Sequence, residues 1–297
     1  MFKLSYLKSF FYHSPLLYRR FNNTLNPVIN LKYYRHASRC KKSYEKRSGN
    51  KIYDNKSPVR SAGVHHVQGV LSRDIANSYS HLIDELISIN SSKLTNTGNS
   101  IVVEKPITNL GFDLINIFHN ENLKLEIMKY FGGHFMVKWL DCYRSIPSED
   151  NGTSWLWHSD NVPTETLKLM LLLTDAPKEK GATLFMSRDD TNRYRQKGYW
   201  GTKVSERVAD LNSFAHDEGL PYEPFCKEAS AGDVLLFDNN NLHKAVPPVS
   251  GYRDACTYLI FPSDEPFERC INNCKISDLE DRPGGYPSKG PNSHASY

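Results

Sequence analysis

The sequence predicts an all-β, jelly-roll core with helices before it, and two observations support this fold class. After His134 the chain consists of short β-branched or aromatic runs separated by turns, among them HFMVKWLDCYRSI, LKLMLLLTD and ACTYLIFP. Strands at this rhythm are typical of an antiparallel sandwich or barrel and not of a βαβ sheet. Long helical periodicity occurs before these runs, so we expect N-terminal helices to flank a jelly roll.

Two helices are expected before the strands. The first follows Ser72, a residue type that caps helix N-termini, and it carries apolar residues at helical spacing. These apolar residues are Ile75, Tyr79, Leu82, Ile83, Leu86 and Ile87. The turn-rich stretch NSSKLTNTGNS ends this helix. The second helix is expected over residues 113–131, and Gly132 and Gly133 would end it as C-cap glycines do.

The remaining segments define the expected domain organisation. Residues 187–224 interrupt the strands with a segment too long for a hairpin, and its basic and aromatic residues fit a solvated lid or a substrate clamp. The last twenty residues have no apolar periodicity, which predicts disorder. We therefore expect a basic N-terminal extension over residues 1–60, one β domain over 61–277 and a disordered tail over 278–297.

The N-terminal extension is strongly basic, although the formal net charge of the whole chain is only +4. Residues 1–60 carry 14 lysines and arginines against Glu45 and Asp54, whereas the remainder has 23 bases and 31 acids. Such a segment is typical of a mitochondrial transit peptide, of an arm that lies on a membrane surface or an anionic partner, or of a solvated extension. We expect a cytoplasmic location, with the mitochondrion as the alternative.

The sequence contains no apolar run long enough to span a bilayer, and its six cysteines lack the spacing of a disulfide framework. Cys270 and Cys274 form a C-x3-C pair without a second pair at zinc-ribbon spacing. We interpret the cysteines as reduced thiols of an intracellular protein. A disulfide near the C-terminal end is the alternative.

Two segments carry the residues of a candidate metal site. In the first, TSWLWHSDNVPTET, His158 and Asp160 are two residues apart, so on a strand they would face the same side. This H-x-D pattern alone occurs often by chance. In the second, GDVLLFDNNNLHKAVPPVSGYRDACTYLIF, His243 begins a strand and Arg253 follows ten residues later across a turn. A hairpin of that length would place Arg253 beside His243.

Two histidines and one carboxylate on adjacent strands form the facial triad of non-heme Fe(II) oxygenases, which leaves three coordination positions open. We therefore predict that His158, Asp160 and His243 are the metal ligands and the catalytic residues. A guanidinium is a planar fork of donors that suits the far end of a dicarboxylate. Arg253 is the candidate for that role.

The combined pattern resembles the Fe(II)/2-oxoglutarate-dependent dioxygenases. The stretches WHSDN, LKLMLLLTDAPKEKGATLFM and GDVLLFDNNNLHKAV are similar to those of the phytanoyl-CoA dioxygenase family, and the likeness covers roughly Gly69 to Ser263. It implies a double-stranded β-helix, which is a cupin-like jelly roll. It also implies Fe(II), O2 and 2-oxoglutarate as cosubstrate, with Arg253 on the distal carboxylate. The implied reaction oxidises a small-molecule or carrier-linked substrate and releases succinate and CO2.

The chain departs from the family pattern at two places. The segment SRDD at residues 187–190 replaces the usual GSH, and Ala255 stands where many relatives have a small hydroxyl residue. Thr257, Tyr258 or Tyr143 would then complete the cosubstrate pocket. Of these, Tyr143 is our candidate for binding the cosubstrate together with the arginine.

Asp160 also bears on the expected reaction outcome. Related halogenases replace this carboxylate with glycine or alanine, so its presence favours hydroxylation, or desaturation or cyclisation. The cationic insertion suggests an anionic small-molecule substrate, such as a phosphate, a coenzyme A thioester or a nucleotide sugar, and no nucleic-acid partner is expected. The alternatives are a cupin-like metal-binding protein without oxygenase activity and an inactive binding module. Arg253 argues against the first alternative, and the intact triad argues against the second.

Overall fold

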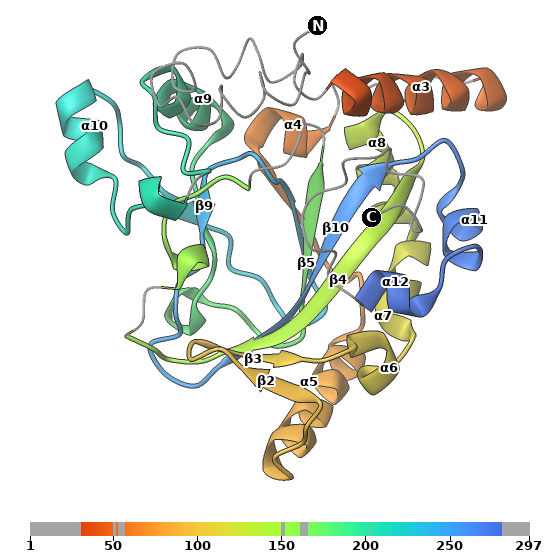
Figure 1. Cartoon of the computed structure of the whole chain (residues 1–297), viewed down its shortest axis with the longest axis horizontal. Helices are drawn as coiled ribbons and strands as arrows, with labels where there is room; N and C mark the ends of the chain where they lie inside the picture. Colours follow the sequence, from red (N-terminus) through yellow and green to blue (C-terminus); the bar gives the residue numbers. More distant parts are fainter. Residues whose placement is uncertain are drawn as a thin grey trace, which may run out of the picture.

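Two antiparallel sheets form the centre of the protein (Figure 1). The computed structural model describes residues 31–49, 52, 57–149, 152–160, 166–202 and 204–280. The strands of the large sheet are β1 (Val64–Val67), β2 (Leu94–Asn96), β3 (Ser100–Val103), β4 (Phe135–Ser145), β5 (Leu167–Leu172), β8 (Val234–Asp238) and β10 (Arg253–Pro262). Those of the small sheet are β6 (Leu184–Phe185), β7 (Phe225–Cys226) and β9 (His243–Lys244). The strand orders are β1-β8-β5-β10-β4-β3-β2 and β7-β6-β9.

This arrangement confirms the predicted all-β core, a jelly roll of the double-stranded β-helix type. β4 and β10 are the longest strands, and they lie side by side from the Arg253↔Ser145 pair to the Pro262↔Phe135 pair (Figure 1). β5 pairs with the other edge of β10 and not with β4, its predecessor in the chain. β8 then pairs with β5, and β1 with β8, so strands that are distant in sequence alternate across the sheet.

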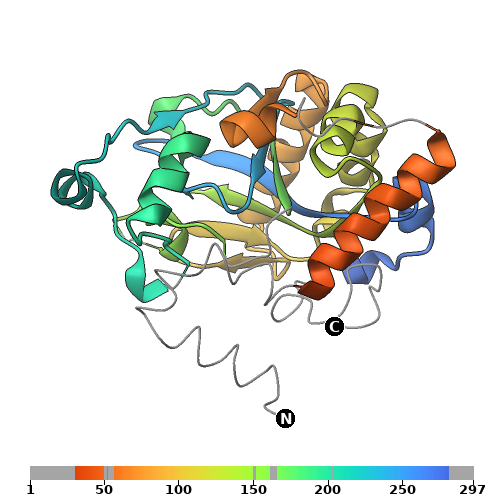
Figure 2. The same cartoon turned by 90° about the horizontal axis from the view of Figure 1, so that it is seen from above.

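Helices flank the sheets. Those before the first long strand are α3 (Leu31–Ser48), α4 (Pro58–Ala62), α5 (Arg73–Ser88), α6 (Pro106–Leu110), α7 (Asp113–Asn116) and α8 (Glu121–Phe131). Those after it are α9 (Arg188–Gln196), α10 (Asn212–Glu218), α11 (Phe267–Asn272) and α12 (Ile276–Glu280). Short 3-10 turns are η2 (Ile117–His119), η3 (Thr153–Trp155), η4 (Lys178–Lys180) and η5 (Val204–Glu206). In Figures 1 and 2, α10 and α3 lie at opposite ends of the molecule.

The helix caps explain which helical predictions hold. The hydroxyl of Ser72 accepts a hydrogen bond from the backbone amide of Ile75, so α5 begins where the sequence predicts. The second predicted helix, over residues 113–131, is not continuous. Asn120 has extended backbone angles, and its side chain accepts hydrogen bonds from the first amides of α8, so it ends η2 and starts a new helix. Gly132 ends α8 in a left-handed conformation, as expected.

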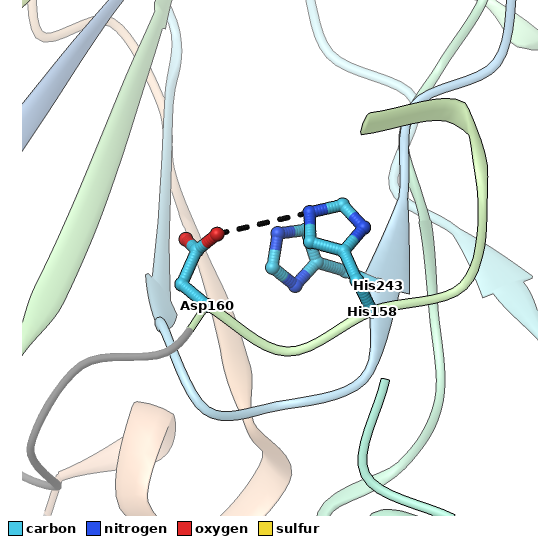
Figure 3. Close-up of side chains that lie close together, drawn as sticks. All are labelled: His158, Asp160 and His243. Carbon is cyan, nitrogen blue, oxygen red and sulfur yellow. Dashed lines mark ion pairs between the residues drawn. The ribbon is translucent and has the colours of Figure 1, made fainter. Parts of the chain in front are cut away.

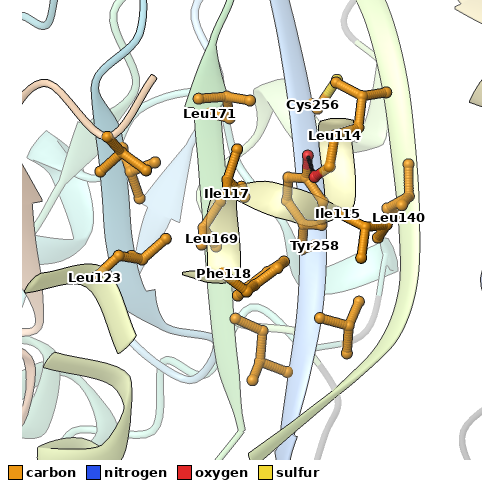
Figure 4. Close-up of a cluster of buried hydrophobic side chains, with 14 of the residues drawn as sticks. Leu114, Ile115, Ile117, Phe118, Leu123, Leu140, Leu169, Leu171, Cys256 and Tyr258 are labelled. Carbon is orange, nitrogen blue, oxygen red and sulfur yellow. Dashed lines mark hydrogen bonds between the residues drawn. The ribbon is translucent and has the colours of Figure 1, made fainter. Parts of the chain in front are cut away.

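The main hydrophobic core lies between the large sheet and the helices α5 to α8 (Figure 4). Alternate residues of each strand face it, as the two-residue period of a strand requires. The labelled strand residues are Leu140, Leu169, Leu171, Cys256 and Tyr258, and the helical ones are Leu114, Ile115, Ile117, Phe118 and Leu123. The residues between them on each strand, such as Met170 and Phe237, face the small sheet instead. The space between the two sheets is therefore lined by the second face of the large sheet.

The insertion over residues 187–224 is folded and carries its own small core. Tyr194 and Leu211 are fully buried around Trp157, together with Tyr199. The hydroxyl of Tyr199 donates to the backbone carbonyl of Trp157, 2.8 Å away. The insertion is thus anchored to the segment that carries the H-x-D motif, and it does not form a separate solvated lid.

Parts of the predicted extension and tail contact the β core. In α3, the Tyr33 ring packs edge-on against Phe261 of β10, and in α4 the side chain of Val59 is fully buried. Residues 1–30 and 281–297 lie outside the described residues. At the other end, α12 continues into the range assigned to the tail, and the Glu280 carboxylate accepts a 2.9 Å hydrogen bond from the hydroxyl of Thr108. The boundaries at residues 60 and 278 stay predictions that truncation would test.

A pair of truncated proteins tests the N-terminal boundary. Because burial of a valine side chain stabilises a protein by about 1.5–3 kcal/mol, a chain from Ser61, which lacks α3 and Val59, should be less stable than a chain from Leu31. For a domain of this size each kcal/mol corresponds to roughly 2–4 °C in Tm. Thermal unfolding of both chains measures the difference. Equal Tm values would show that residues 31–60 add nothing to the stability of the β domain.

Two further features concern the sequence predictions on cysteines and membranes. The six cysteines are free thiols, and Cys142 and Cys256 are direct neighbours on β4 and β10. None of the described helices is both long enough and apolar enough to cross a membrane.

Candidate active site

His158 and His243 lie directly opposite each other on adjacent chain segments. Their backbones form an antiparallel bridge, with the amide of His158 donating to the His243 carbonyl at 3.0 Å and the reverse bond at 2.9 Å. Gly201 packs against this bridge with a φ of +60°, and a β-carbon built on it would lie 2.8 Å from the α-carbon of His158. Only glycine fits such an approach without displacing the histidine backbone.

Each histidine is held by a backbone carbonyl two residues before it. The Nδ1 atom of His158 lies 2.7 Å from the Leu156 carbonyl oxygen, and that of His243 lies 2.8 Å from the Asn241 carbonyl oxygen. A carbonyl oxygen can only accept, so both Nδ1 atoms carry the proton and donate it. Both Nε2 atoms therefore keep a lone pair, which is the arrangement that orients a metal-binding histidine.

The Asp160 carboxylate completes a group of three possible metal ligands (Figure 3). Its Oδ1 atom lies 3.8 Å from the Nε2 atom of His158, and the two imidazole rings are 4.3 Å apart between centroids. One ligand atom from each of the three residues lies within 4.8 Å of the others, which makes the group a candidate to hold one metal ion. Among the described residues, this is the one such cluster of three or more.

The electrostatic surroundings favour metal-binding protonation states. Burial lowers the pKa of His158 to about 3, assisted by the neighbouring His243, and burial lowers the pKa of His243 to about 4. Both imidazoles are consequently neutral at pH 7. Burial alone would raise the pKa of Asp160, but the ammonium of Lys168 beside it outweighs burial and holds this pKa below its usual value. The site thus offers two neutral nitrogens and one carboxylate anion.

The three residues line a cavity of about 640 Å³ between the two sheets. Its walls come from β4, β5, β8 and β10 of the large sheet and from β9 of the small one. The β2–β3 hairpin contributes Asn99 and Ser100, and the folded insertion contributes Arg207. This volume lies within the usual range of ligand-binding pockets.

Arg253 lies in the same cavity and is almost completely buried, with 1% of its surface exposed. One terminal nitrogen donates to the Gly181 carbonyl and the other lies 3.3 Å from the Ser145 hydroxyl oxygen, while Nε has no partner among the described residues. Burial lowers the pKa of Arg253, and no ion pair to it is present in the described part of the chain. A buried cation without a counter-charge is costly, so this wall of the cavity suits the carboxylate of a ligand.

The three candidates for completing the pocket around Arg253, which are Tyr143, Thr257 and Tyr258, do not all lie on the same face of the sheet. Tyr143 and Thr257 both line the cavity, and Tyr143 is the direct neighbour of Ala255 across β4 and β10. Burial raises the pKa of Tyr143, so its hydroxyl stays protonated and able to donate. Tyr258 faces the helices and donates to the Leu114 carbonyl at 2.8 Å, so its nomination from the sequence was wrong. Consecutive strand residues face opposite sides of a sheet. Because Thr257 faces the cavity, Tyr258 must face away from it.

Lys168 is a site residue that the sequence reasoning missed. Its ammonium lies 2.9 Å from the Oδ2 atom of Asp160. The available signal was a lysine within the apolar strand LKLMLLL, where a charged residue needs a polar partner on its own face of the sheet.

Comparisons with known proteins support the fold. The epimerase SnoN from nogalamycin biosynthesis, described as non-heme and alpha ketoglutarate dependent, has 16% sequence identity and a TM-score of 0.50, covering 78% of this chain and 90% of SnoN. The carbocyclase SnoK, with the same description, has 18% identity and a TM-score of 0.50, covering 76% and 91%. No protein-family model and no curated protein matches the sequence. The likeness shows a shared fold, and the resemblance to the phytanoyl-CoA dioxygenase family stays a prediction.

Proposed function

We propose that the protein is an Fe(II)- and 2-oxoglutarate-dependent oxygenase acting on a small-molecule or carrier-linked substrate. The observation that carries this proposal is the content of one cavity. It combines two neutral histidines and a carboxylate with a buried arginine that has no acidic partner among the described residues. A plain metal-binding protein of the cupin type would have no use for that arginine.

The donor set fits iron(II). Two imidazole nitrogens and one carboxylate oxygen form the facial triad that leaves three positions open on a six-coordinate ion. His158, His243 and Asp160 would hold the metal, and the carbonyls of Leu156 and Asn241 would fix the orientation of the two rings. When bound, Fe(II) supplies the redox chemistry that couples oxidative decarboxylation of 2-oxoglutarate to oxidation of a substrate, releasing succinate and CO2.

The cosubstrate proposal rests on Arg253 and its neighbours. The guanidinium would donate two parallel hydrogen bonds to the distal carboxylate of 2-oxoglutarate, and this carboxylate would provide the missing counter-charge. Tyr143 and Thr257 would add hydroxyl donors from the same wall of the cavity. The descriptions of SnoN and SnoK as alpha ketoglutarate dependent, which is the same compound, support this choice of cosubstrate.

Hydroxylation is the proposed outcome. Asp160 occupies the position of the third ligand, so no site is left for a halide at that position. SnoN and SnoK are described as an epimerase and a carbocyclase, which shows that one fold hosts several outcomes. Arg207, which the insertion places in the cavity, supports a substrate that carries a negative charge.

The proposed function is tested by measuring succinate. The protein is incubated with Fe(II), 2-oxoglutarate and O2, with and without fractionated small-molecule extracts, and products are followed by mass spectrometry. We expect succinate release that depends on Fe(II) and rises with an extract fraction in which one compound gains an oxygen atom. Absence of succinate with every fraction, together with no binding of 2-oxoglutarate to the Fe(II) form, would contradict the proposal.

A further inference from the structure

Lys168 is the feature of the cavity that the proposed function does not yet use. It lies on β5 between Leu167 and Leu169, whose side chains pack in the helix-covered core, so its own side chain faces the cavity. Across the sheet its backbone pairs with Leu259 of β10 and Phe237 of β8. Its ammonium lies 5.9 Å from the Phe237 ring centroid. These apolar neighbours restrict the directions in which the Lys168 side chain can extend.

The ammonium is directed at one oxygen of the Asp160 carboxylate. Lys168 Nζ is 2.9 Å from Oδ2, whereas Oδ1 is the oxygen nearest to the Nε2 atom of His158, at 3.8 Å. Both side chains of the pair are mostly buried, with 19% and 17% of their surfaces exposed. A charge-assisted hydrogen bond in such surroundings is short and directional. The two carboxylate oxygens are therefore distinguished before any metal arrives.

We propose that Lys168 is a positioning residue that restricts Asp160 to binding the metal through one oxygen. A carboxylate can bind one ion through one or both oxygens, and the second mode uses an additional coordination position. With both oxygens bound, a six-coordinate ion would keep only two open positions. A chelating 2-oxoglutarate would fill both of these, and none would remain for O2. The consequence for cosubstrate binding rests on the proposed function, whereas the restriction to one oxygen concerns the metal alone.

The first experiment uses Zn(II) alone and does not depend on activity. The infrared difference spectrum between the Zn(II)-loaded and metal-free protein reports the separation of the asymmetric and symmetric carboxylate stretches, which narrows when both oxygens bind one ion. We expect a wide separation in the wild type and in Lys168→Arg, which restores a cationic donor. Lys168→Met should show a narrow separation. Lys180→Met, which removes an exposed lysine that does not line the cavity, should match the wild type.

The second experiment titrates 2-oxoglutarate into the Fe(II) protein without oxygen, following the metal-to-ligand charge-transfer band. A chelating 2-oxoglutarate would still fill the two open positions in Lys168→Met, so we expect the band to form there. On addition of O2, we expect succinate release from Lys168→Met to be about 10- to 100-fold slower than from the wild type, the usual contribution of a partner that orients a ligand, with recovery in Lys168→Arg. Metal affinity should not fall in Lys168→Met, because the variant removes a positive charge beside a ligand. Loss of metal binding, which a structural role of the ion pair would cause, overturns the inference.

The two experiments separate this inference from the proposed function. If Zn(II) binds through one oxygen of Asp160 in the wild type and through both oxygens in Lys168→Met, the positioning role stands even when 2-oxoglutarate fails to bind. Only the proposed function is then rejected. An unchanged infrared separation in Zn(II)-loaded Lys168→Met overturns the positioning role, whatever the outcome with 2-oxoglutarate.

Discussion

Replacing Asp160 with alanine is expected to remove the oxygenase activity. The variant leaves two histidines as protein ligands and deletes the only negative charge among the three. Loss of an orienting partner alone commonly costs 10- to 100-fold, so loss of a ligand should lower turnover by more than about 100-fold. Fe(II) affinity should also fall, because the positive charges of the ion and of Lys168 are no longer balanced. Succinate release at saturating Fe(II), together with a metal titration, measures both effects.

Asp160→Glu should fail as well, although it keeps the charge. The additional methylene displaces the carboxylate by more than the roughly 0.5 Å within which a catalytic group must be held. Asp189→Ala is the matched control, because Asp189 is exposed on α9 and does not line the cavity. Its stability should stay within about 0.5 kcal/mol of the wild type, with normal turnover. Wild-type turnover in both Asp160 variants would show that this residue is an ordinary polar group beside the cavity.

Replacing Arg253 with lysine should separate cosubstrate binding from metal binding. Lysine keeps a positive charge but loses the planar fork that donates two parallel hydrogen bonds. Removing one partner of a buried charge pair costs about 3–5 kcal/mol, and the retained charge should reduce this loss to about 10- to 100-fold in 2-oxoglutarate affinity. Fe(II) affinity should be unchanged, because Arg253 is not one of the three ligands. The charge-transfer band on titration with 2-oxoglutarate gives the affinity.

Two controls make this prediction specific. Arg193→Lys alters an exposed arginine of α9 and should bind 2-oxoglutarate as the wild type does. 2-Oxovalerate, a 2-oxo acid without the distal carboxylate, should not discriminate between wild type and Arg253→Lys. Equal 2-oxoglutarate affinities in Arg253→Lys and wild type would remove the arginine from the cosubstrate site.

The sequence predicted those parts of the fold that depend on local periodicity. The short apolar and aromatic runs of β4, β5 and β10, separated by turns, are enough to identify the strands, and Ser72 marks the start of α5 by its hydroxyl. The break at Asn120 was missed because the apolar period continues across it, whereas a capping side chain decides the backbone conformation there. The contact of α3 with β10 was also missed. This contact is a tertiary one, and the spacing of apolar residues along the chain does not specify which strand a helix packs against.

The candidate site was predictable where spacing alone carried the information. The H-x-D pair identified His158 and Asp160, although they lie outside the named strands and His158 forms only an isolated bridge. His243 and Arg253 were found on the last two strands, but the expected hairpin between them was wrong, because β9 pairs with β6 and β10 pairs with β4 and β5. Lys168 could not be assigned in the same way, since its partner became clear only when β5 was seen to pass beside the carboxylate. Tyr258 was nominated because the chemistry of a tyrosine suits the pocket. The register of β10 turns it toward the helices instead.

A crystal structure of the protein with Mn(II) in place of iron and with 2-oxoglutarate tests the central claim most directly. We predict one ion bound to the Nε2 atoms of His158 and His243 and to one oxygen of Asp160, with bonds of about 2.0–2.2 Å. The keto acid end of 2-oxoglutarate should contact the ion, and its distal carboxylate should accept hydrogen bonds from Arg253. An ion bound elsewhere, or a 2-oxoglutarate carboxylate away from Arg253, would contradict the proposed oxygenase site.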